Sequence, residues 1–170
     1  MFQRIQSVYM IAGTVAILMM LLFPLGTIGS EEAFFDVSAL GVTCVTEGVD
    51  LDEMRYANFL LLLVMLALPS VCSFLFKKPK LQQRILIYTA VLDVLYYAYF
   101  FLVEVPAIKP LAAGALECAG LPTEVTMDAS FVLFAMPALS VFCCIMAWRG
   151  VTYDILLLES AERLRPSRKK

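Results

Sequence analysis

A single carboxylate interrupts the third of four long apolar segments in this 170-residue chain. Asp93 lies within Ile85–Val103, a run of nineteen residues, and about 20 apolar residues in a helix cross a hydrocarbon core of roughly 30 Å. It stands nine residues from Arg84, which is about 13 Å along a helix axis and close to the middle of a bilayer. Acidic side chains at that depth are rare and usually functional. Asp93 is therefore the first candidate for a functional residue.

Polar side chains of the other apolar segments are expected at the same depth as Asp93. Counted inward from the basic end of each segment, one hydroxyl residue falls seven to ten positions along it. Such residues normally face the interior of a helix bundle. Further polar residues share the face of Asp93 on its own helix, because offsets of three, four and eleven return to one side. The predicted intramembrane polar site comprises Asp93, Thr14, Ser70, Ser140, Thr89, Tyr96, Tyr97 and Glu104.

Two interpretations of this polar site compete. In the first, Asp93 is the centre of a proton- or ion-responsive pathway, and Glu104 stands at its outer mouth. In the second, Asp93 is a neutral acid that donates a hydrogen bond to Thr14, Ser70 or Ser140 and holds the helices together. The apolar segments contain no Lys or Arg that could pair with an ionised Asp93, so the second interpretation is favoured.

Other catalytic chemistry finds little support in the sequence. Histidine is absent, which removes the commonest metal ligand, the usual haem ligand and the commonest general base. We find no catalytic motif, expect no cofactor and no metal site, and favour a protein that is not an enzyme. The polar loops hold Cys44 and Cys118 on the same side of the membrane, where a disulfide and two free thiols are both compatible with the sequence.

Composition predicts an all-α membrane protein. The chain is 61% hydrophobic with a mean hydropathy of +0.84, whereas soluble domains are about 45–50% apolar. We predict a four-helix transmembrane domain over residues 1–150, with spans at about 8–25, 56–76, 85–103 and 131–148. A cleaved signal peptide is the rival interpretation of the first span, whose apolar run exceeds the usual length of about 7–15 residues. The head, the central turn and the tail hold 11 of the 13 Lys and Arg, which by the positive-inside rule places both termini in the cytoplasm.

The two outer loops are acidic. In the first, β-branched and aromatic residues in Phe34–Leu40 and Val42–Thr46 flank Gly41 and predict a short β-hairpin. An isolated hairpin is only marginally stable, so we expect it to lean on the second outer loop or on a partner. In the second loop, residues 104–130, three prolines are expected to discourage a helix.

Residues 151–170 are predicted to form a cytoplasmic amphipathic helix with a basic tail. Val151, Ile155 and Leu158 recur at helical spacing. Either the helix anchors the chain at the membrane surface, where each basic residue near anionic headgroups contributes about 1 kcal/mol, or it docks on a partner. The anchor is favoured. The residues predicted to contact headgroups are Arg163, Arg165, Arg168, Lys169 and Lys170.

Three segments of the chain resemble a known family. Met1–Tyr9, the basic turn Phe76–Arg84 and the closing stretch Arg149–Arg165 are similar to small four-span bacterial inner-membrane proteins of the Bacteroidetes type, catalogued as domain of unknown function 4293. Ile155 follows Asp154 where the resemblance leads us to expect another acid, and the outer loops show no likeness. The resemblance implies a Gram-negative inner membrane with the acidic loops in the periplasm, and it implies no activity.

These observations favour a structural or accessory module that binds other membrane proteins through its acidic loops or its tail. The expected partners are the lipid bilayer and other membrane proteins; self-association is also compatible with the sequence, and nothing indicates nucleic acid. One alternative is a small proton- or ion-coupled transporter or channel-like component that uses Asp93 and Glu104. A membrane enzyme is the third hypothesis.

Overall fold

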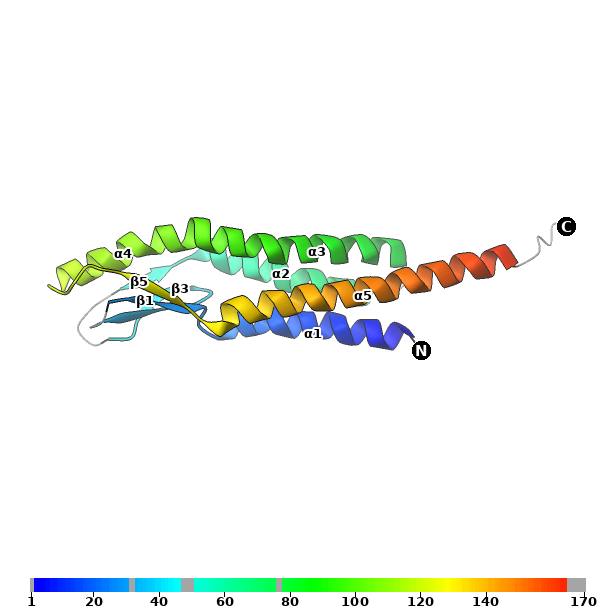
Figure 1. Cartoon of the computed structure of the whole chain (residues 1–170), viewed down its shortest axis with the longest axis horizontal. Coiled ribbons are helices and arrows are strands. Elements are labelled where there is room, and N and C mark those ends of the chain that lie inside the picture. Colours follow the sequence, from blue (N-terminus) through cyan, green and yellow to red (C-terminus); the bar gives the residue numbers. More distant parts are fainter. Residues whose placement is uncertain (1, 31–32, 47–50, 76–77, 165–170) are drawn as a thin grey trace.

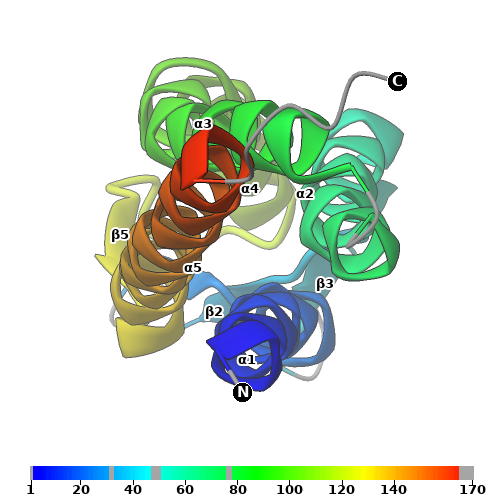
Figure 2. The ribbon, with the colours of Figure 1, turned by 90° about the vertical axis from the view of Figure 1, so that its right-hand side faces the viewer.

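Four apolar helices form the body of the protein. The structure is a computed structural model and describes residues 2–30, 33–46, 51–75 and 78–164. Helices α1 (Phe2–Leu22), α2 (Tyr56–Phe74), α3 (Pro79–Tyr99) and α5 (Phe131–Leu164) run side by side as a bundle (Figure 1), and Figure 2 shows them end-on. Each contains an apolar segment long enough to cross a membrane, and only 28–33% of each segment is buried inside the structure. Most of their apolar surface therefore faces outward.

The fourth helix continues well past the predicted domain boundary at residue 150. α5 is helical without interruption from Phe131 to Leu164, and its C-terminal part projects beyond the ends of the other helices (Figure 1). The predicted amphipathic tail helix is thus a direct extension of the fourth apolar helix.

A five-stranded antiparallel sheet caps the opposite end of the bundle. Its strands are β1 (Gly26–Gly29), β2 (Phe34–Val37), β3 (Gly41–Cys44), β4 (Asp52–Met54) and β5 (Thr126–Ala129), in the order β4-β3-β2-β1-β5. The predicted hairpin is confirmed as β2 and β3, with Val37 opposite Val42. The expected support from the second outer loop is confirmed as well, because β5 pairs with β1.

The close approach of β4 to β3 requires a glycine at position 41. A Cβ there would lie 2.0 Å from the carbonyl oxygen of Glu53 on β4, and Gly41 has a φ of +155°. Neither the contact nor the backbone conformation suits a residue with a side chain. Gly41 is therefore needed for β4 to pair with β3.

The expectation that the second outer loop avoids helix is wrong. A π-helical turn, η1 (Phe100–Glu104), joins α3 directly to α4 (Val105–Cys118). Pro106 lies in the first turn of α4, where proline is tolerated. Pro110 lies inside the helix, and both prolines are on its exposed face. Water can reach the carbonyl group that Pro110 leaves without an amide donor, so the helix continues.

One stripe of buried residues follows this continuous helix from the bundle to the sheet. In an α-helix, residues four positions apart differ by about 40° around the axis, so a stripe of such residues winds around the helix. A π-helical turn holds more residues per turn and therefore reduces this winding. α4 therefore presents the same side to the sheet that α3 presents to the bundle. The stripe consists of Thr89, Asp93, Tyr96, Phe100, Glu104, Ile108, Ala112 and Leu116.

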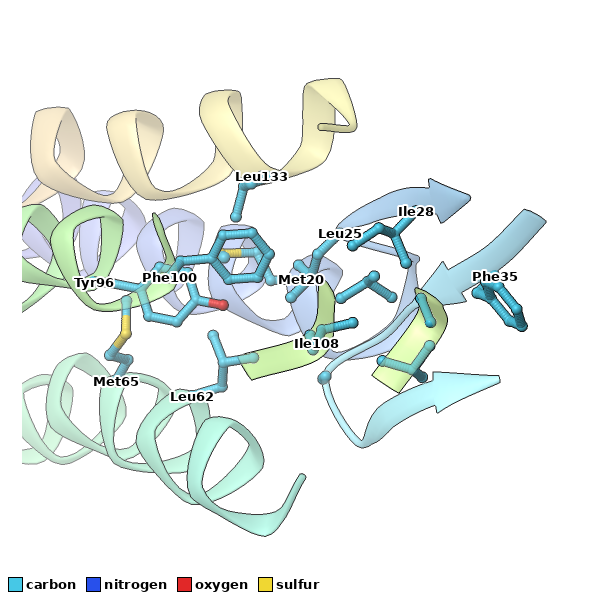
Figure 3. Close-up of a cluster of buried hydrophobic side chains, with 14 of the residues drawn as sticks. Met20, Leu25, Ile28, Phe35, Leu62, Met65, Tyr96, Phe100, Ile108 and Leu133 are labelled. Carbon is cyan, nitrogen blue, oxygen red and sulfur yellow. The ribbon is translucent and has the colours of Figure 1, made fainter. Parts of the chain in front are cut away.

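A single hydrophobic core joins the sheet to the bundle. Figure 3 shows bundle side chains such as Tyr96 and Phe100 close to Leu25 and to Ile108 of α4. Leu25 immediately precedes β1. Ile28 and other inward-facing strand residues belong to the same cluster. We call the sheet together with η1 and α4 the outer module. Because it shares its core with the helices, the outer module is held rigidly on the bundle.

Candidate functional site

Asp93 lies deep in the bundle beside Ser140 of α5. Both side chains are 0% exposed. The Ser140 hydroxyl faces the Asp93 carboxyl, but among the described residues neither side chain has a partner that meets hydrogen-bond geometry. Gly13 of α1 completes the contact, since a Cβ at that position would lie 3.7 Å from Ser140 Oγ. Three helices therefore meet near Ser140, and the structure brings one of the three predicted hydroxyl partners to the Asp93 carboxyl.

The remaining predicted hydroxyl groups bond to helix carbonyl groups. Thr14 donates to Met10 at 2.9 Å and Ser70 donates to Leu66 at 2.7 Å, each within its own helix. Such bonds one turn back are common for Ser and Thr in helices. Thr89 likewise donates to the carbonyl of Ile85 at 2.9 Å. None of these bonds reaches Asp93.

Tyr97 reaches across to α5, one turn before the proline in that helix. Its hydroxyl donates to the carbonyl of Phe134 at 2.5 Å, and Pro137 lies within α5. A proline weakens the bonding of the preceding turn. Tyr97 therefore supplies a donor near that weakened turn and ties α3 to α5.

Glu104 is enclosed where the bundle meets the outer module. It is 1% exposed, and its Oε2 lies 3.0 Å from Nε of Arg55. Its other carboxylate oxygen accepts a hydrogen bond from the Tyr99 hydroxyl. The carboxylate that the sequence placed at the mouth of a pathway is thus paired and covered.

A second buried polar chain runs beside this ion pair. Tyr96 donates its hydroxyl to Asn58 Oδ1 at 3.1 Å, and Asn58 donates to the carbonyl of Ala39 at 3.3 Å. These bonds connect α3, α2 and the turn between β2 and β3. Sequence reasoning missed Arg55 and Asn58, although Arg55 is the only basic residue of the acidic first loop.

The opposite end of the bundle carries hydrogen bonds between helices. Gln6 on α1 donates to Asp154 on α5 at 2.7 Å. Gln83 on α3 donates to the hydroxyl of Thr152 on α5 at 2.9 Å. Sequence analysis did not single out either glutamine, because a glutamine near a helix end has no distinctive spacing.

An apolar groove runs along the outside of the bundle between α3 and α5. Its volume is about 540 Å³, and no polar surface contributes to its lining. The residues lining it are Leu86, Ile87, Ala90, Val91, Val94, Leu95, Val141, Cys144, Ile145 and Trp148. A groove of this composition suits a hydrocarbon ligand better than a polar substrate.

The cysteines and the basic tail complete the predicted site residues. No disulfide joins any of the five cysteines, all of which are among the described residues. Cys44 donates to the carbonyl of Thr46, and Cys118 is exposed at the end of α4. The pairing of Cys44 with Cys118 stays a prediction. Arg163 belongs to α5, whereas the predicted headgroup contacts Arg165, Arg168, Lys169 and Lys170 lie outside the described residues. Within the described residues, no group of three or more His, Cys, Asp or Glu is arranged to hold a metal ion.

Comparison with known proteins identifies the family. No curated protein matches the chain. The model of the family described as "Domain of unknown function (DUF4293)" matches residues 2–164, which is nearly the whole sequence. The resemblance seen in the two ends and the central turn is thereby confirmed, and the chain belongs to the DUF4293 family.

Proposed function

We propose that this chain is a multi-pass protein of a bacterial inner membrane that presents the outer module to other membrane proteins. Both termini lie in the cytoplasm, and the outer module lies in the periplasm. Four long apolar helices with mostly outward-facing surface support insertion in a membrane. The concentration of Lys and Arg at the other end of the bundle supports this orientation.

The observation that carries an interaction role is the rigid attachment of the outer module. One helix runs from α3 through η1 into α4, the core is shared, and the Arg55–Glu104 pair is buried at the junction. A docking surface held in a fixed orientation loses less freedom when a partner binds. The surface is strongly acidic, which favours a partner with positive charge.

The surroundings of Asp93 favour a structural role over an ion pathway. Towards the outer module its helix continues with Tyr96 and Phe100, both 0% exposed, and then with the paired Glu104. Movement of an ion along this face would require these side chains to separate. In proteoliposomes, Asp93→Asn should therefore fold normally and leave pH-dependent ion flux unchanged from wild type. Loss of such flux in a folded variant would favour the transporter hypothesis instead.

Photo-crosslinking tests the interaction role directly. A benzophenone amino acid placed at Phe34, which is 49% exposed on the sheet, should yield a discrete crosslinked product in cells. The matched control is Leu60, which is 62% exposed on α2 and should face lipid. A product from Phe34 and none from Leu60 is expected, and mass spectrometry would identify a membrane-protein partner or a second copy of the chain. Val45, which follows β3 and is 62% exposed, is a second crosslinking position. If Phe34 and Val45 both remain uncrosslinked, the interaction role is wrong.

Thiol labelling tests the orientation. Cys44 is half-buried on the outer module, so the labelling uses a Cys44→Ser background. Cys118 is exposed on α4, so a membrane-impermeant maleimide added to spheroplasts should label this background but not the Cys44→Ser, Cys118→Ser double variant. A Lys78→Cys variant in that double-variant background should be labelled only after the membrane is broken. Labelling of Lys78→Cys in intact spheroplasts would reverse the proposed topology.

A further inference from the structure

The groove between α3 and α5 has the length of one leaflet's hydrocarbon. On α3 its lining runs from Leu86 to Leu95, nine residue steps or about 14 Å of helix. Half of a hydrocarbon core of roughly 30 Å is about 15 Å. On α5 the lining runs from Trp148 to Val141, in the opposite chain direction. The groove therefore extends from the basic end of the bundle to about its middle.

A polar bridge and two arginines mark the basic end of the groove. Just beyond its lining, Gln83 donates to Thr152 at 2.9 Å and joins the two helices. Arg84 precedes Ile87 by three residues and Arg149 follows Ile145 by four, so each arginine shares the helix face that lines the groove. Both arginines are exposed, and among the described residues neither has an ion-pair partner. Two unpaired positive charges thus flank the mouth.

Trp148 lies at the same end of the groove. Its ring contributes to the apolar lining, and it immediately precedes Arg149. Tryptophan is enriched at the level of the lipid headgroups in membrane proteins. The basic end of the groove therefore suits the junction between an acyl chain and its headgroup.

We propose that this groove binds an anionic phospholipid of the cytoplasmic leaflet. One acyl chain lies along α3 and α5, and the headgroup phosphate lies between Arg84 and Arg149. The two exposed arginines without ion-pair partners among the described residues favour a chain with an anionic headgroup over an apolar helix of a partner. This inference rests on the proposed insertion in a membrane and is otherwise independent of the outer module.

The sole tryptophan of the chain makes the test specific. Trp148 is the only Trp, so bromine atoms on a lipid in the groove should quench the intrinsic fluorescence. The protein is reconstituted into two sets of vesicles with the same mixture of phosphatidylglycerol and phosphatidylcholine. In one set the phosphatidylglycerol is brominated near the top of its acyl chains, and in the other the phosphatidylcholine is. Each arginine near an anionic headgroup should raise affinity about 5-fold, so phosphatidylglycerol should be preferred by about 5- to 30-fold.

Two double variants with the same charge change separate a site from general surface attraction. Arg84→Gln with Arg149→Gln should reduce the preference to less than about 2-fold. Lys78→Gln with Lys80→Gln removes two charges from the same side of the bundle and should keep it. Ala90→Phe, which fills the groove, should weaken quenching by both lipids while helix content and elution volume stay unchanged.

Each result either supports or overturns the site. Equal quenching by the two brominated lipids in wild type, or an equal loss of preference in the two double variants, would overturn the specific site. Either result would leave insertion in the membrane intact. Absence of quenching by both lipids would overturn the proposed insertion, and the lipid site with it.

Discussion

Removal of the Arg55 guanidinium should leave a buried carboxylate without its counter-charge. Nε of Arg55 lies 3.0 Å from Oε2 of Glu104, and the two side chains are 23% and 1% exposed. At an effective dielectric constant of about 20, charges at this distance attract by about 5 kcal/mol before desolvation is deducted. Removing one partner of a fully buried pair costs about 3–5 kcal/mol. Because Arg55 is partly exposed, we expect Arg55→Gln to lower the free energy of unfolding by about 2–3 kcal/mol.

Substitution of Glu104 should lower the free energy of unfolding less than substitution of Arg55. Glu104→Gln keeps an oxygen that accepts the hydrogen bond from Tyr99, and the partly exposed Arg55 can turn to water, so we expect a loss of about 1 kcal/mol. The double variant should also lose about 1 kcal/mol, since no charge is left unpaired. The double-mutant cycle then gives a coupling energy of about 2–3 kcal/mol.

Three buried cysteines allow these free energies to be measured in detergent. A maleimide dye that fluoresces on reaction reports their exposure during titration with denaturant, in a background without Cys44 and Cys118. The reporters are Cys72, Cys143 and Cys144. A coupling energy below about 0.5 kcal/mol lies within the usual scatter of independent sites. Such a value would refute the conclusion that this ion pair stabilises the junction between the bundle and the outer module.

Three further substitutions test the contacts between elements. Gly41→Ala places a Cβ 2.0 Å from the Glu53 carbonyl oxygen, so limited proteolysis should cut near β4 faster than in wild type, and unchanged protection would contradict the β3–β4 pairing. Tyr96→Phe leaves the buried Asn58 Oδ1 without its donor and should cost about 1–3 kcal/mol in the thiol assay; a loss below about 0.3 kcal/mol would mean that water replaces the hydroxyl. Gly13→Ala meets only ordinary contacts, the nearest at 3.5 Å to Cys143 Cβ, and should be tolerated, whereas Gly13→Leu should separate α1 from α5 at a cost of about 1–3 kcal/mol. Equal stability of the two variants would contradict the close packing.

The four apolar helices were predictable because hydropathy and length act over many residues. Predicted and observed boundaries agree closely at Tyr56 and Phe131, where a polar loop meets a long apolar run. The β2–β3 hairpin was predictable from its β-branched residues and from Gly41. In contrast, β4 consists of Asp52, Glu53 and Met54, and nothing in such a segment signals a strand. Its pairing depends on β3, which a local pattern cannot reveal.

Helix α4 was not predicted, because the number of prolines in a segment does not by itself exclude a helix. Proline is costly in a helix interior but not in the first turn, and the cost at Pro110 is reduced on a face open to water. The position of a proline relative to the helix start and to the core decided the outcome, and neither was visible before the chain was folded.

The position of the candidate site along the bundle was predictable, but the hydrogen-bond and ion-pair partners of its residues were not. Burial of Asp93 and its proximity to Ser140 agree with the count of residues from the basic ends. Thr14 and Ser70 bond within their own helices, because a carbonyl one turn back is always within reach. The partnership of Arg55 with Glu104 joins positions 49 residues apart. Only the packing of α2 against the continuous helix brings these two side chains together.

The strand order has a consequence for how the protein is made. β1 lies inside the sheet, between β2 and β5, yet β5 comes from residues synthesised about a hundred positions later, after the third apolar segment. In the topology proposed above, one edge of β1 therefore stays without a partner until the third apolar segment has crossed the membrane and Thr126–Ala129 has been translocated. An unpaired strand edge invites pairing with other chains. A nascent chain that stalls before residue 126 should therefore be especially prone to aggregation or to capture by a chaperone.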